Sequence, residues 1–404
     1  MSRVTVVVFS EVKWRYMRTR KRFLLSRFPP EWPILFLEPM NRTDPTHLAP
    51  VTDGRVTIAT LPALKAKTTL PLLNALLAQA PVRAGLTELA ALRVRELIAR
   101  HAPGRPRCFL LSNILLAPIA ARFPHDLLIY DANDDPLGFP GTPAWMAGYL
   151  AQTLALADVT VACSEALAMR LTGAGARLVT MIGNGVEFEH FAQPPDPERL
   201  PPLVRGRARP WIGYAGAVAE WFDLELVGAV AEAFPQATIL IAGPIAEPVA
   251  HRAAALTLEH RNLVFLGRVP YEDLPHLVAE FDVAMIPFRR GPATDVLNPN
   301  KLYEYLAAGR TLVTLDYSPD IVRFQHSIYL AHDPGTFVAQ VGKALASPLD
   351  PVGLRAIAAR ESWDVRAAAL VGLIRERLGL PECRVIARRL GQRGCGIMPG
   401  CRWG

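Results

Sequence analysis

The chain contains 404 residues, of which 51% are hydrophobic and 20% are charged. A single hydrophobic core rarely serves more than about 250–300 residues, so this length predicts two domains, and the composition excludes a disordered or fibrous protein. The formal net charge of +7 favours anionic partners such as phosphates, acidic lipids or nucleic acid. No apolar window reaches the roughly 18 residues that a membrane-spanning helix needs, and we expect no secretory signal at the N-terminus.

The first unusual segment is the basic stretch "KWRYMRTRKRFLLSR", residues 13–27, which has seven cations and no acid. Its aromatic and leucine residues alternate with the cations, a pattern typical of an element that rests on an anionic membrane surface. In that reading, residues 23–25 enter the headgroup boundary, while Arg18, Lys21 and Arg22 contact lipid phosphates. The alternative is an ordinary helix of the first domain, with its apolar face turned inward and its cations solvated or bound to an acceptor's pyrophosphate.

Short apolar, β-branched runs alternate with helical patterns along the whole chain, as expected for parallel strands buried on both faces. The runs predicted as strands of the first half are 3–10, 33–39, 108–113, 127–134, 158–164 and 178–185. Those predicted for the second half are 211–216, 237–243, 263–267, 283–288, 311–316 and 327–332. This alternation indicates βαβ units in two α/β domains with doubly wound sheets, whose ligands bind beyond the carboxyl ends of the strands.

The polar, proline-rich stretch at 192–210 separates the two series of strands and is predicted to be an interdomain linker. We therefore assign residues 1–195 to a first domain and residues 209–364 to a second. Residues 365–404 are assigned to a C-terminal helix and tail.

The stretch "LLIYDANDDPLGF" places Asp131, Asp134 and Asp135 at the carboxyl end of a predicted strand. Carboxylates this close repel one another, so one pKa is expected to rise into the range useful for a general base. Asp134 and Asp135 are the candidate catalytic residues. The alternative is a turn rich in Asp and Asn, which Pro136 and Gly138 would also favour.

The segment "LNPNKLYEYLAAG" predicts a helix capped by Asn298, with Pro299 as its first residue and Gly309 just beyond its end. Lys301 and Glu304 lie one turn apart on the same face. A lysine in the first turn is unfavourable with respect to the helix dipole, unless an anion such as a phosphate lies opposite. The alternative is a surface ion pair.

Cysteine usage indicates a reducing compartment, because five cysteines in a long chain do not form a disulfide framework. Cys383, Cys395 and Cys401 lie together near the C-terminus, but they lack the paired spacing of zinc sites and no histidine is close. The sequence thus predicts no metal site and a cytoplasmic protein.

Several of these segments, taken in order, resemble the GT-B glycosyltransferases, in particular the large family four. They are "WIGYAGAVAEWFDLELV", "ATILIAGP", "NLVFLGRVPYEDLPHLVAEFDVAMIPF" and "VLNPNKLYEYLAAGRTLVT", preceded by "VACSEAL" and "MIGNGVEFEHF" and followed by "ESWDVRA". The N-terminal fragments resemble the polysaccharide-assembly branch, which includes teichuronic-acid-type enzymes. The resemblance spans roughly residues 4–375. It implies two Rossmann-like, doubly wound domains facing each other across a cleft, the first binding the acceptor and the second the nucleotide sugar.

The resemblance also implies roles for individual residues. Lys301 would contact the diphosphate and take part in catalysis, Glu304 would accept the ribose hydroxyl protons, and Asp134 matches a catalytic aspartate in a "Y-x-x-x-D" context. The loop after residue 267 would read the base, and the preceding glycines would allow backbone to approach phosphate. The expected nucleotide-sugar-binding residues are Gly213, Gly216, Val269, Tyr271, Thr294, Asn298, Lys301 and Glu304.

The sequence also departs from the family's pattern. Val296 occupies the place of the first of two acids often found eight residues apart, and Ala217 and Trp221 stand where a cationic clamp is usual. Charge neutralisation then falls to Lys301, with Arg289 or Arg290 as candidates to assist it.

The sequence predicts a glycosyltransferase that moves a sugar from a nucleotide-diphosphate-sugar donor to a lipid-linked or polysaccharide acceptor. It needs no metal or other cofactor, and it is cytoplasmic and peripheral at the inner face of the membrane, with residues 13–27 as the contact. The alternatives are a nucleotide-sugar epimerase of the same fold and a non-catalytic protein that binds nucleotide sugar or anions. Nucleic acid is the least supported partner, because no binding module surrounds the basic segment.

Overall fold

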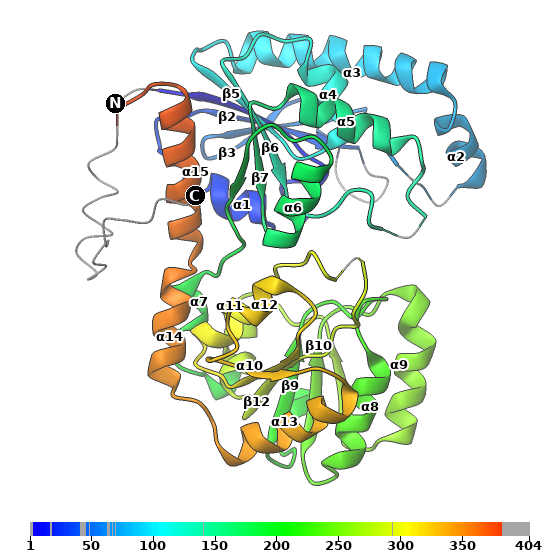
Figure 1. Ribbon diagram of the computed structural model, residues 1–404, viewed down its shortest axis with the longest axis vertical. Coiled ribbons are helices and arrows are strands. Elements are labelled where there is room, and N and C mark those ends of the chain that lie inside the picture. The colour runs from blue at the N-terminus through cyan, green and yellow to red at the C-terminus, as the bar shows by residue number, and fades with distance from the viewer. Residues whose placement is uncertain are drawn as a thin grey trace.

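The computed structural model describes residues 3–16, 18–40, 46, 47, 49–62, 65, 66, 68, 70–139, 141–292 and 294–381. Each half of the chain forms its own sheet, and helices cover both (Figure 1). Among the described residues the first sheet has eight strands in the order β3-β4-β2-β1-β5-β6-β7-β8, and the second has six in the order β11-β10-β9-β12-β13-β14. All neighbouring pairs are parallel except β3 with β4. The predicted pair of doubly wound α/β domains is confirmed.

The strands of the first sheet are β1 (Thr5–Phe9), β2 (Ile34–Pro39), β3 (Val51–Asp53), β4 (Val56–Leu61), β5 (Arg107–Leu111), β6 (Leu127–Ala132), β7 (Val159–Ala162) and β8 (Val179–Met181). Its helices are α1 (Arg20–Leu25), α2 (Pro71–Leu77), α3 (Ala80–His101), the 3-10 turn η1 (Ile114–Leu116), α4 (Ala117–Ala120), α5 (Met146–Leu156) and α6 (Glu165–Gly173).

The strands of the second sheet are β9 (Trp211–Ala215), β10 (Thr238–Ala242), β11 (Leu263–Gly267), β12 (Val283–Ile286), β13 (Leu312–Leu315) and β14 (Tyr329–Ala331). The accompanying helices are α7 (Phe188–Phe191), α8 (Leu224–Ala233), α9 (Glu247–Glu259), α10 (Leu274–Ala279), α11 (Asn300–Ala307), α12 (Pro319–Val322), α13 (Pro334–Ala346), α14 (Pro351–Arg360) and α15 (Trp363–Arg377), with 3-10 turns η2 (Pro197–Arg199) and η3 (Pro202–Val204).

The first sheet is buried on both faces, which explains why its strands are apolar without alternation. In β1, Val7 and Phe9 belong to one hydrophobic core, whereas Val6 and Val8 belong to another. Successive side chains of a strand point to opposite faces, so each core lies on one side of the sheet. This double burial holds the carboxyl ends of the central strands in fixed positions.

The chain passes from the first domain to the second earlier than composition suggests. Ile182 lies in a core of the first domain and Val186 in the core of the second. The crossing therefore falls between these residues rather than at residue 195. The proline-rich stretch expected to be a linker is part of the second domain, because it forms η2 and η3 and fully buries Val204.

The C-terminal helix returns to the first domain. Val186 forms a parallel bridge with Ser362, and α15 then packs against α1, with Trp363 stacked on Phe23 at a ring-centroid distance of 5.1 Å. In Figure 1, α15 runs along the edge of the molecule beside α1. Cys383, Cys395 and Cys401 lie outside the described residues. No helix in the described part of the chain is long and apolar enough to cross a bilayer.

One glycine expected at the phosphate serves packing instead. Gly213 lies in the middle of β9, and a Cβ atom built on it would come within 2.3 Å of the Phe281 ring. The close approach needed at this position is that of an aromatic ring in the core of the second domain. The phosphate role predicted for Gly213 is therefore wrong.

We expect Gly213→Ala to destabilise the second domain by about 1–3 kcal/mol, the usual cost of overpacking a core. Gly372→Ala is the control, because Gly372 is exposed in α15 and has no atom within 4 Å of the added Cβ. This variant should gain up to about 1 kcal/mol from helix propensity. Thermal unfolding measures both, and an unchanged melting temperature for Gly213→Ala would contradict the packing role.

Candidate active site

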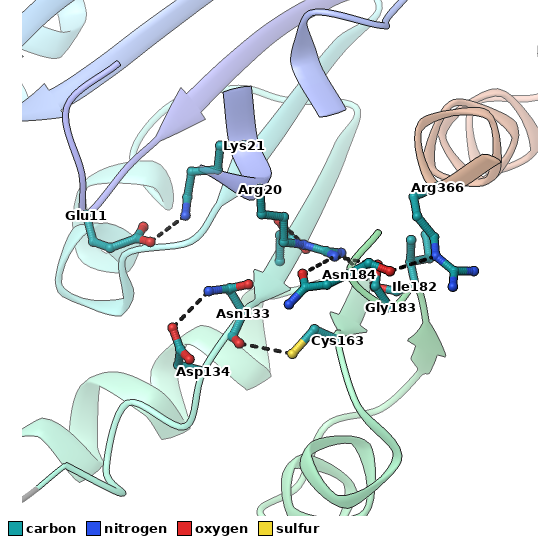
Figure 2. A network of polar contacts seen from close by, with 11 residues as sticks. Glu11, Arg20, Lys21, Asn133, Asp134, Cys163, Ile182, Gly183, Asn184 and Arg366 are labelled. Atoms are coloured by element: carbon teal, nitrogen blue, oxygen red, sulfur yellow. Dashed lines mark hydrogen bonds and ion pairs between the residues drawn. The ribbon is translucent and has the colours of Figure 1, made fainter. Parts of the chain in front are cut away.

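A cavity of about 460 Å³ opens at the carboxyl ends of the central strands of the first sheet. Asp134 and Asn133 reach it from the end of β6, Glu11 from the end of β1, and Ser112 and Asn113 from the end of β5. In Figure 2, Glu11 and Asp134 both lie to the left of Asn133, and a dashed line joins Asn133 to Asp134. The first domain thus offers a pocket that contains two carboxyl groups, at the sheet edge where ligands bind in such folds.

Asp134 differs from the other two aspartates of its cluster because no arginine among the described residues pairs with it. Its Oδ2 accepts a hydrogen bond of 2.9 Å from Asn133 Nδ2. Burial raises the pKa of the Asp134 carboxyl, and the nearby Glu11 carboxylate adds to the rise, while Asn133, Lys21 and Arg20 oppose it. A carboxyl with a raised pKa inside a pocket has the properties of a general base or acid.

The other two aspartates have structural partners. Asp131 is bound by the guanidinium of Arg20, with Nη2 to Oδ1 at 3.1 Å. Asp135 pairs with Arg170 Nη1 at 2.5 Å and accepts a hydrogen bond of 2.9 Å from the backbone N–H of Leu137. Asp135 therefore has the contacts of the turn reading, and its catalytic role stays a prediction. Burial and Glu11, rather than repulsion within the cluster, set the pKa of Asp134.

Arg20 is the centre of a buried network that sequence reasoning missed (Figure 2). Besides Asp131, its guanidinium donates to the carbonyls of Ile182 and Gly183 at 2.7 and 2.8 Å and to Asn184 Oδ1 at 3.1 Å. Next to it, Lys21 pairs with Glu11, whose other oxygen accepts from Ser112 at 2.6 Å. The two cations of α1 thus hold the pocket and the interdomain crossing in one network.

The basic segment is an internal element of the first domain, so the predicted insertion of residues 23–25 into a headgroup layer is wrong. Phe23, Leu24 and Leu25 are only 6%, 2% and 2% exposed, and they pack in the core against α15. Arg18 pairs with Glu187 and Glu272 of the second domain. Met17, within the same segment, lies outside the described residues.

In the second domain, Lys301 and Glu304 form an ion pair of 2.9 Å on the first turns of α11. Glu304 is 7% exposed, and Lys301 Cε lies 3.0 Å from the position that a Cβ on Gly216 would occupy. The pair is therefore mostly buried beside the turn after β9, which is not the geometry of a solvated surface pair. Gly216 belongs to this group of residues.

The helix itself differs from its predicted start. Pro299 is the N-cap and α11 begins at Asn300, while Gly309 ends it with a φ of +71°. Asn298 does not cap the helix. Its side chain accepts from Tyr303 OH at 2.9 Å and donates to Asp320 at 2.8 Å, and its backbone carbonyl accepts from Asn184 at 2.7 Å.

Two more side chains that were expected to bind the nucleotide sugar have partners within the protein. The buried hydroxyl of Thr294 donates to the carbonyl of Arg289 at 2.6 Å, which closes its own loop. Tyr271 donates its hydroxyl to Glu187 at 2.8 Å, and its ring lies between His190 and the guanidinium of Arg18. The side chains of Asn298, Thr294 and Tyr271 thus stabilise the fold and the domain contact rather than facing an open ligand site.

The other second-domain residues named from the sequence have contacts of their own. Val269 is half-buried and packs against the core of the second domain. Arg289 lies 3.7 Å from Asp223, and Arg290 pairs with Asp316, so both candidate assisting cations have acidic partners.

The loop before α11 connects the two domains. Val296 is 3% exposed and packs in a core of the first domain. Its carbonyl accepts from Ser164 Oγ at 2.7 Å, and Asp320 accepts from the backbone N–H of Glu165 at 3.1 Å. The position where relatives often carry an acid is therefore used here for an apolar contact between the domains.

Within the described part of the chain, no group of three or more His, Cys, Asp or Glu side chains is arranged to hold a metal ion. Cys163, beside Asn133, donates its thiol to the Asn133 carbonyl at 3.0 Å, and burial raises its pKa to about 12. The thiol is therefore neutral near pH 7 and is not an activated nucleophile.

Two Rossmann-like parallel-sheet domains, joined by a short crossing and a returning C-terminal helix, define the GT-B fold. Sucrose-phosphate synthase from Thermosynechococcus elongatus shares this fold with a TM-score of 0.66 and 15% identity, over 97% of this chain and 98% of that one. HepE from Anabaena in complex with UDP gives a TM-score of 0.63 and 16% identity, over 93% and 100% of the chains. Similarity at this level of identity shows the fold alone.

Residues 209–347 match the family described as "Glycosyl transferases group 1", so this part of the second domain is a group 1 glycosyl transferase domain. The chain is also similar to TuaH of Bacillus subtilis (strain 168), whose name describes a teichuronic acid biosynthesis glycosyltransferase. The two are 30% identical over 141 residues, which is 35% of this chain and 35% of that protein. The match thus spans about a third of the relative's length.

The raised pKa of Asp134 predicts a specific pH dependence of stability. The folded protein holds this proton at a pH where the unfolded chain releases it, so the group destabilises the fold as pH rises above the ordinary aspartate pKa of about 3.9. Asp134→Asn should therefore melt near the wild-type temperature at pH 4 and above it at pH 7.

Asp135→Asn serves as the control, because it breaks the pair with Arg170 and should lower the melting temperature at pH 7. If Asp134→Asn were less stable than wild type at pH 7 but equal at pH 4, the carboxylate would be stabilising and the assignment would fail.

Proposed function

We propose that the protein is a glycosyltransferase that moves a sugar from a nucleotide-diphosphate-sugar donor to a lipid-linked or polysaccharide acceptor. The donor binds in the second domain at Lys301, Glu304 and Gly216, and the acceptor binds in the first-domain cavity at Asp134. The observation that carries the proposal is the presence of one suitable group in each domain. A carboxyl with a raised pKa lies in a pocket of one domain, and a lysine at a helix N-terminus lies in the group 1 domain.

The donor half follows from charge. The N-terminus of α11 provides unpaired N–H groups and the positive end of a helix dipole, and Lys301 adds a full charge, which together suit a diphosphate. The proposal includes no metal ion, because these groups supply the positive charge. Lys301 would exchange its present partner Glu304 for phosphate, which frees the Glu304 carboxylate to accept the ribose hydroxyls.

The acceptor half follows from the pocket. An attacking hydroxyl must lose a proton, and a carboxylate whose pKa is raised takes that proton more readily than an ordinary one. Asp134 faces the cavity, and in the described part of the chain no cationic side chain is bound to it, whereas Asp131 and Asp135 are each bound to an arginine. Asp134 is therefore the base of the proposed transfer.

The known proteins support the classes of donor and acceptor. HepE was solved with UDP and with UDP-glucose, and an E. coli protein of the same fold, named for trehalose-6-phosphate, was solved bound to UDP-2-fluoro glucose. The latter has a TM-score of 0.67 and 14% identity, over 94% of this chain and all of that one. The name of TuaH connects the sequence relative to the assembly of a cell-surface polymer. We take a UDP- or GDP-sugar and a polymer or lipid-linked acceptor as the first candidates.

Thermal stabilisation by a panel of UDP-, GDP-, ADP- and dTDP-sugars tests the donor site. A ligand at a hundred times its dissociation constant should add about 2.7 kcal/mol of stability. Lys301→Ala should weaken binding of the nucleoside diphosphate more than that of the nucleoside, and Glu304→Ala should weaken both, because ribose is common to them.

Lys343→Ala is the matched control, since this lysine lies in the last turn of α13 and should leave binding unchanged. Wild-type affinity in both site variants would reduce the pair to a structural ion pair. No stabilisation by any nucleotide sugar would reject the transferase and leave a non-catalytic anion-binding protein.

Turnover tests the acceptor half. Asp134→Asn keeps the shape of the side chain but removes the base, so turnover should fall at least about a hundredfold with nearly unchanged donor affinity. Asp135→Asn should reduce turnover less, and only as far as it loosens the turn. Equal and small effects of the two substitutions would contradict the role of Asp134. If the donor sugar were converted into its epimer in the absence of an acceptor and without hydrolysis, the protein would instead be an epimerase.

A further inference from the structure

The hydroxyl of Tyr130 is a polar group that reaches the first-domain cavity from within the core. Tyr130 lies in β6 and is 1% exposed, and its ring packs in the same core as Leu115 and Leu128. No hydrogen bond among the described residues involves this hydroxyl, and its oxygen is not one of the unpaired buried atoms that are closed off from solvent. Since Tyr130 lines the cavity that contains Asp134, the hydroxyl is accessible from that cavity.

The other polar side chains that line this cavity already have partners. Ion pairs and hydrogen bonds within the described part of the chain include Glu11, Ser112, Asn113, Asn133, Asp134 and Thr142, and Lys65 also has an interaction of its own. Buried polar groups in folded proteins are nearly always paired, so each exception requires an explanation. An unpaired hydroxyl among paired neighbours at a cavity wall indicates that a ligand supplies its partner.

The environment of Tyr130 makes this hydroxyl a permanent donor. Burial raises the pKa of the phenol well above its ordinary value, and the negative charges of Glu11, Asp135, Asp131 and Asp134 add to the rise. The group therefore keeps its proton throughout the neutral pH range. A neutral donor beside the carboxyl groups of Glu11 and Asp134 suits a ligand that has both acceptor oxygens and O–H donors.

We propose that Tyr130 is an acceptor-binding residue that makes the cavity specific for a neutral sugar ring. Its hydroxyl donates a hydrogen bond to one hydroxyl oxygen of the ring, and this contact holds another hydroxyl of the same ring at Asp134. The assignment of this sugar to the acceptor rests on the proposed function, whereas the sugar site at Tyr130 does not.

The other lining residues favour a sugar over a phosphate. Among the charged side chains that line the cavity in the described ranges, Glu11 and Asp134 are acids and Lys65 is a base, which disfavours an anion. Phe139 lines the same cavity and is 48% exposed, so its aromatic face is available to the C–H groups of a ring. A sugar ring fits both kinds of wall, because its hydroxyls surround an apolar face.

Tyr130→Phe tests first whether the hydroxyl stabilises the fold. The substitution keeps the ring and removes only the unpaired group, so the melting temperature without ligand should stay the same or rise. The matched control is Tyr303→Phe, because the buried hydroxyl of Tyr303 donates to Asn298 at 2.9 Å and accepts from Arg323 at 3.0 Å. The control should melt at a lower temperature. An equal loss in Tyr130→Phe would give its hydroxyl a structural role and overturn the proposal.

Isothermal titration with the methyl glycosides of glucose, galactose, mannose and N-acetylglucosamine tests the ligand class. Wild type should bind at least one of them, and Tyr130→Phe should weaken that binding at least about tenfold, while Tyr303→Phe should leave it unchanged.

The monodeoxy derivatives of the bound glycoside then identify the contact. A site built to bind a substrate hydroxyl rejects an analogue without it, because a buried polar group is left unpaired. One derivative should therefore lose at least about tenfold in affinity for wild type and almost nothing for Tyr130→Phe, in which the same hydrogen bond is already absent.

Three outcomes of these titrations would overturn the proposal. The first is a wild type that binds none of the glycosides. The second is a set of deoxy derivatives that lose equally in wild type and in Tyr130→Phe. The third is displacement of the glycoside by inorganic phosphate, which would assign the cavity to an anion.

Thermal stabilisation by nucleotide sugars, measured on the same variants, separates this inference from the proposed function. Tyr130→Phe should keep the wild-type response, because the proposed donor site lies in the second domain. A protein that binds a glycoside through Tyr130 but is stabilised by no nucleotide sugar would reject the transferase and retain the sugar site. A full nucleotide response without glycoside binding would reject the sugar site alone.

Discussion

The structure depends on one buried cation, Arg20. Its guanidinium is bound to Asp131 and to three acceptors of the segment 182–184, so one side chain joins α1, β6 and the crossing into the second domain. Removing one partner of a buried pair costs about 3–5 kcal/mol, because the remaining charge is left without compensation. Arg20 is 4% and Asp131 5% exposed, so this cost applies to either residue. Asp134 follows Asp131 by three residues, so the contact between Arg20 and Asp131 fixes the position of the pocket.

The contact between the domains likewise consists of polar groups bound to one another within the protein. Polar groups at this contact are bound across it: the carbonyl of Asn298 to Asn184, the carbonyl of Val296 to Ser164, and Arg18 to Glu187. These contacts hold α11 in a defined position relative to the first sheet, so the Lys301–Glu304 pair keeps its place without support from a bound ligand. A helix N-terminus fixed in this way contributes more to a transferring group than a mobile one, because its dipole needs no reorganisation during the reaction.

The sequence predicted correctly those structural features that are determined by residues close together in the chain. Strand and helix periodicity predicted both sheets apart from β3 and β4, Gly309 marked the end of α11, and the position of Asp134 after a strand predicted its place at the pocket. It was misleading wherever the partner lies far along the chain. Nothing near residues 18–25 indicates that Asp131, Glu187, Glu272 and Trp363 will cover this segment, and nothing near Gly213 indicates the Phe281 ring. Glu11 could have been found, because it follows a strand at the same sheet edge as Asp134.

The central claim is that a nucleotide binds at the start of α11 while the pocket of Asp134 remains free for another substrate. Hydrogen–deuterium exchange with saturating UDP, and then with GDP, tests it directly. The account predicts slower exchange for residues 214–218 and 299–305 with at least one of the two nucleotides, and unchanged exchange for residues 133–139. Protection confined to the first-domain pocket, or no protection in the second domain with either nucleotide, would contradict it.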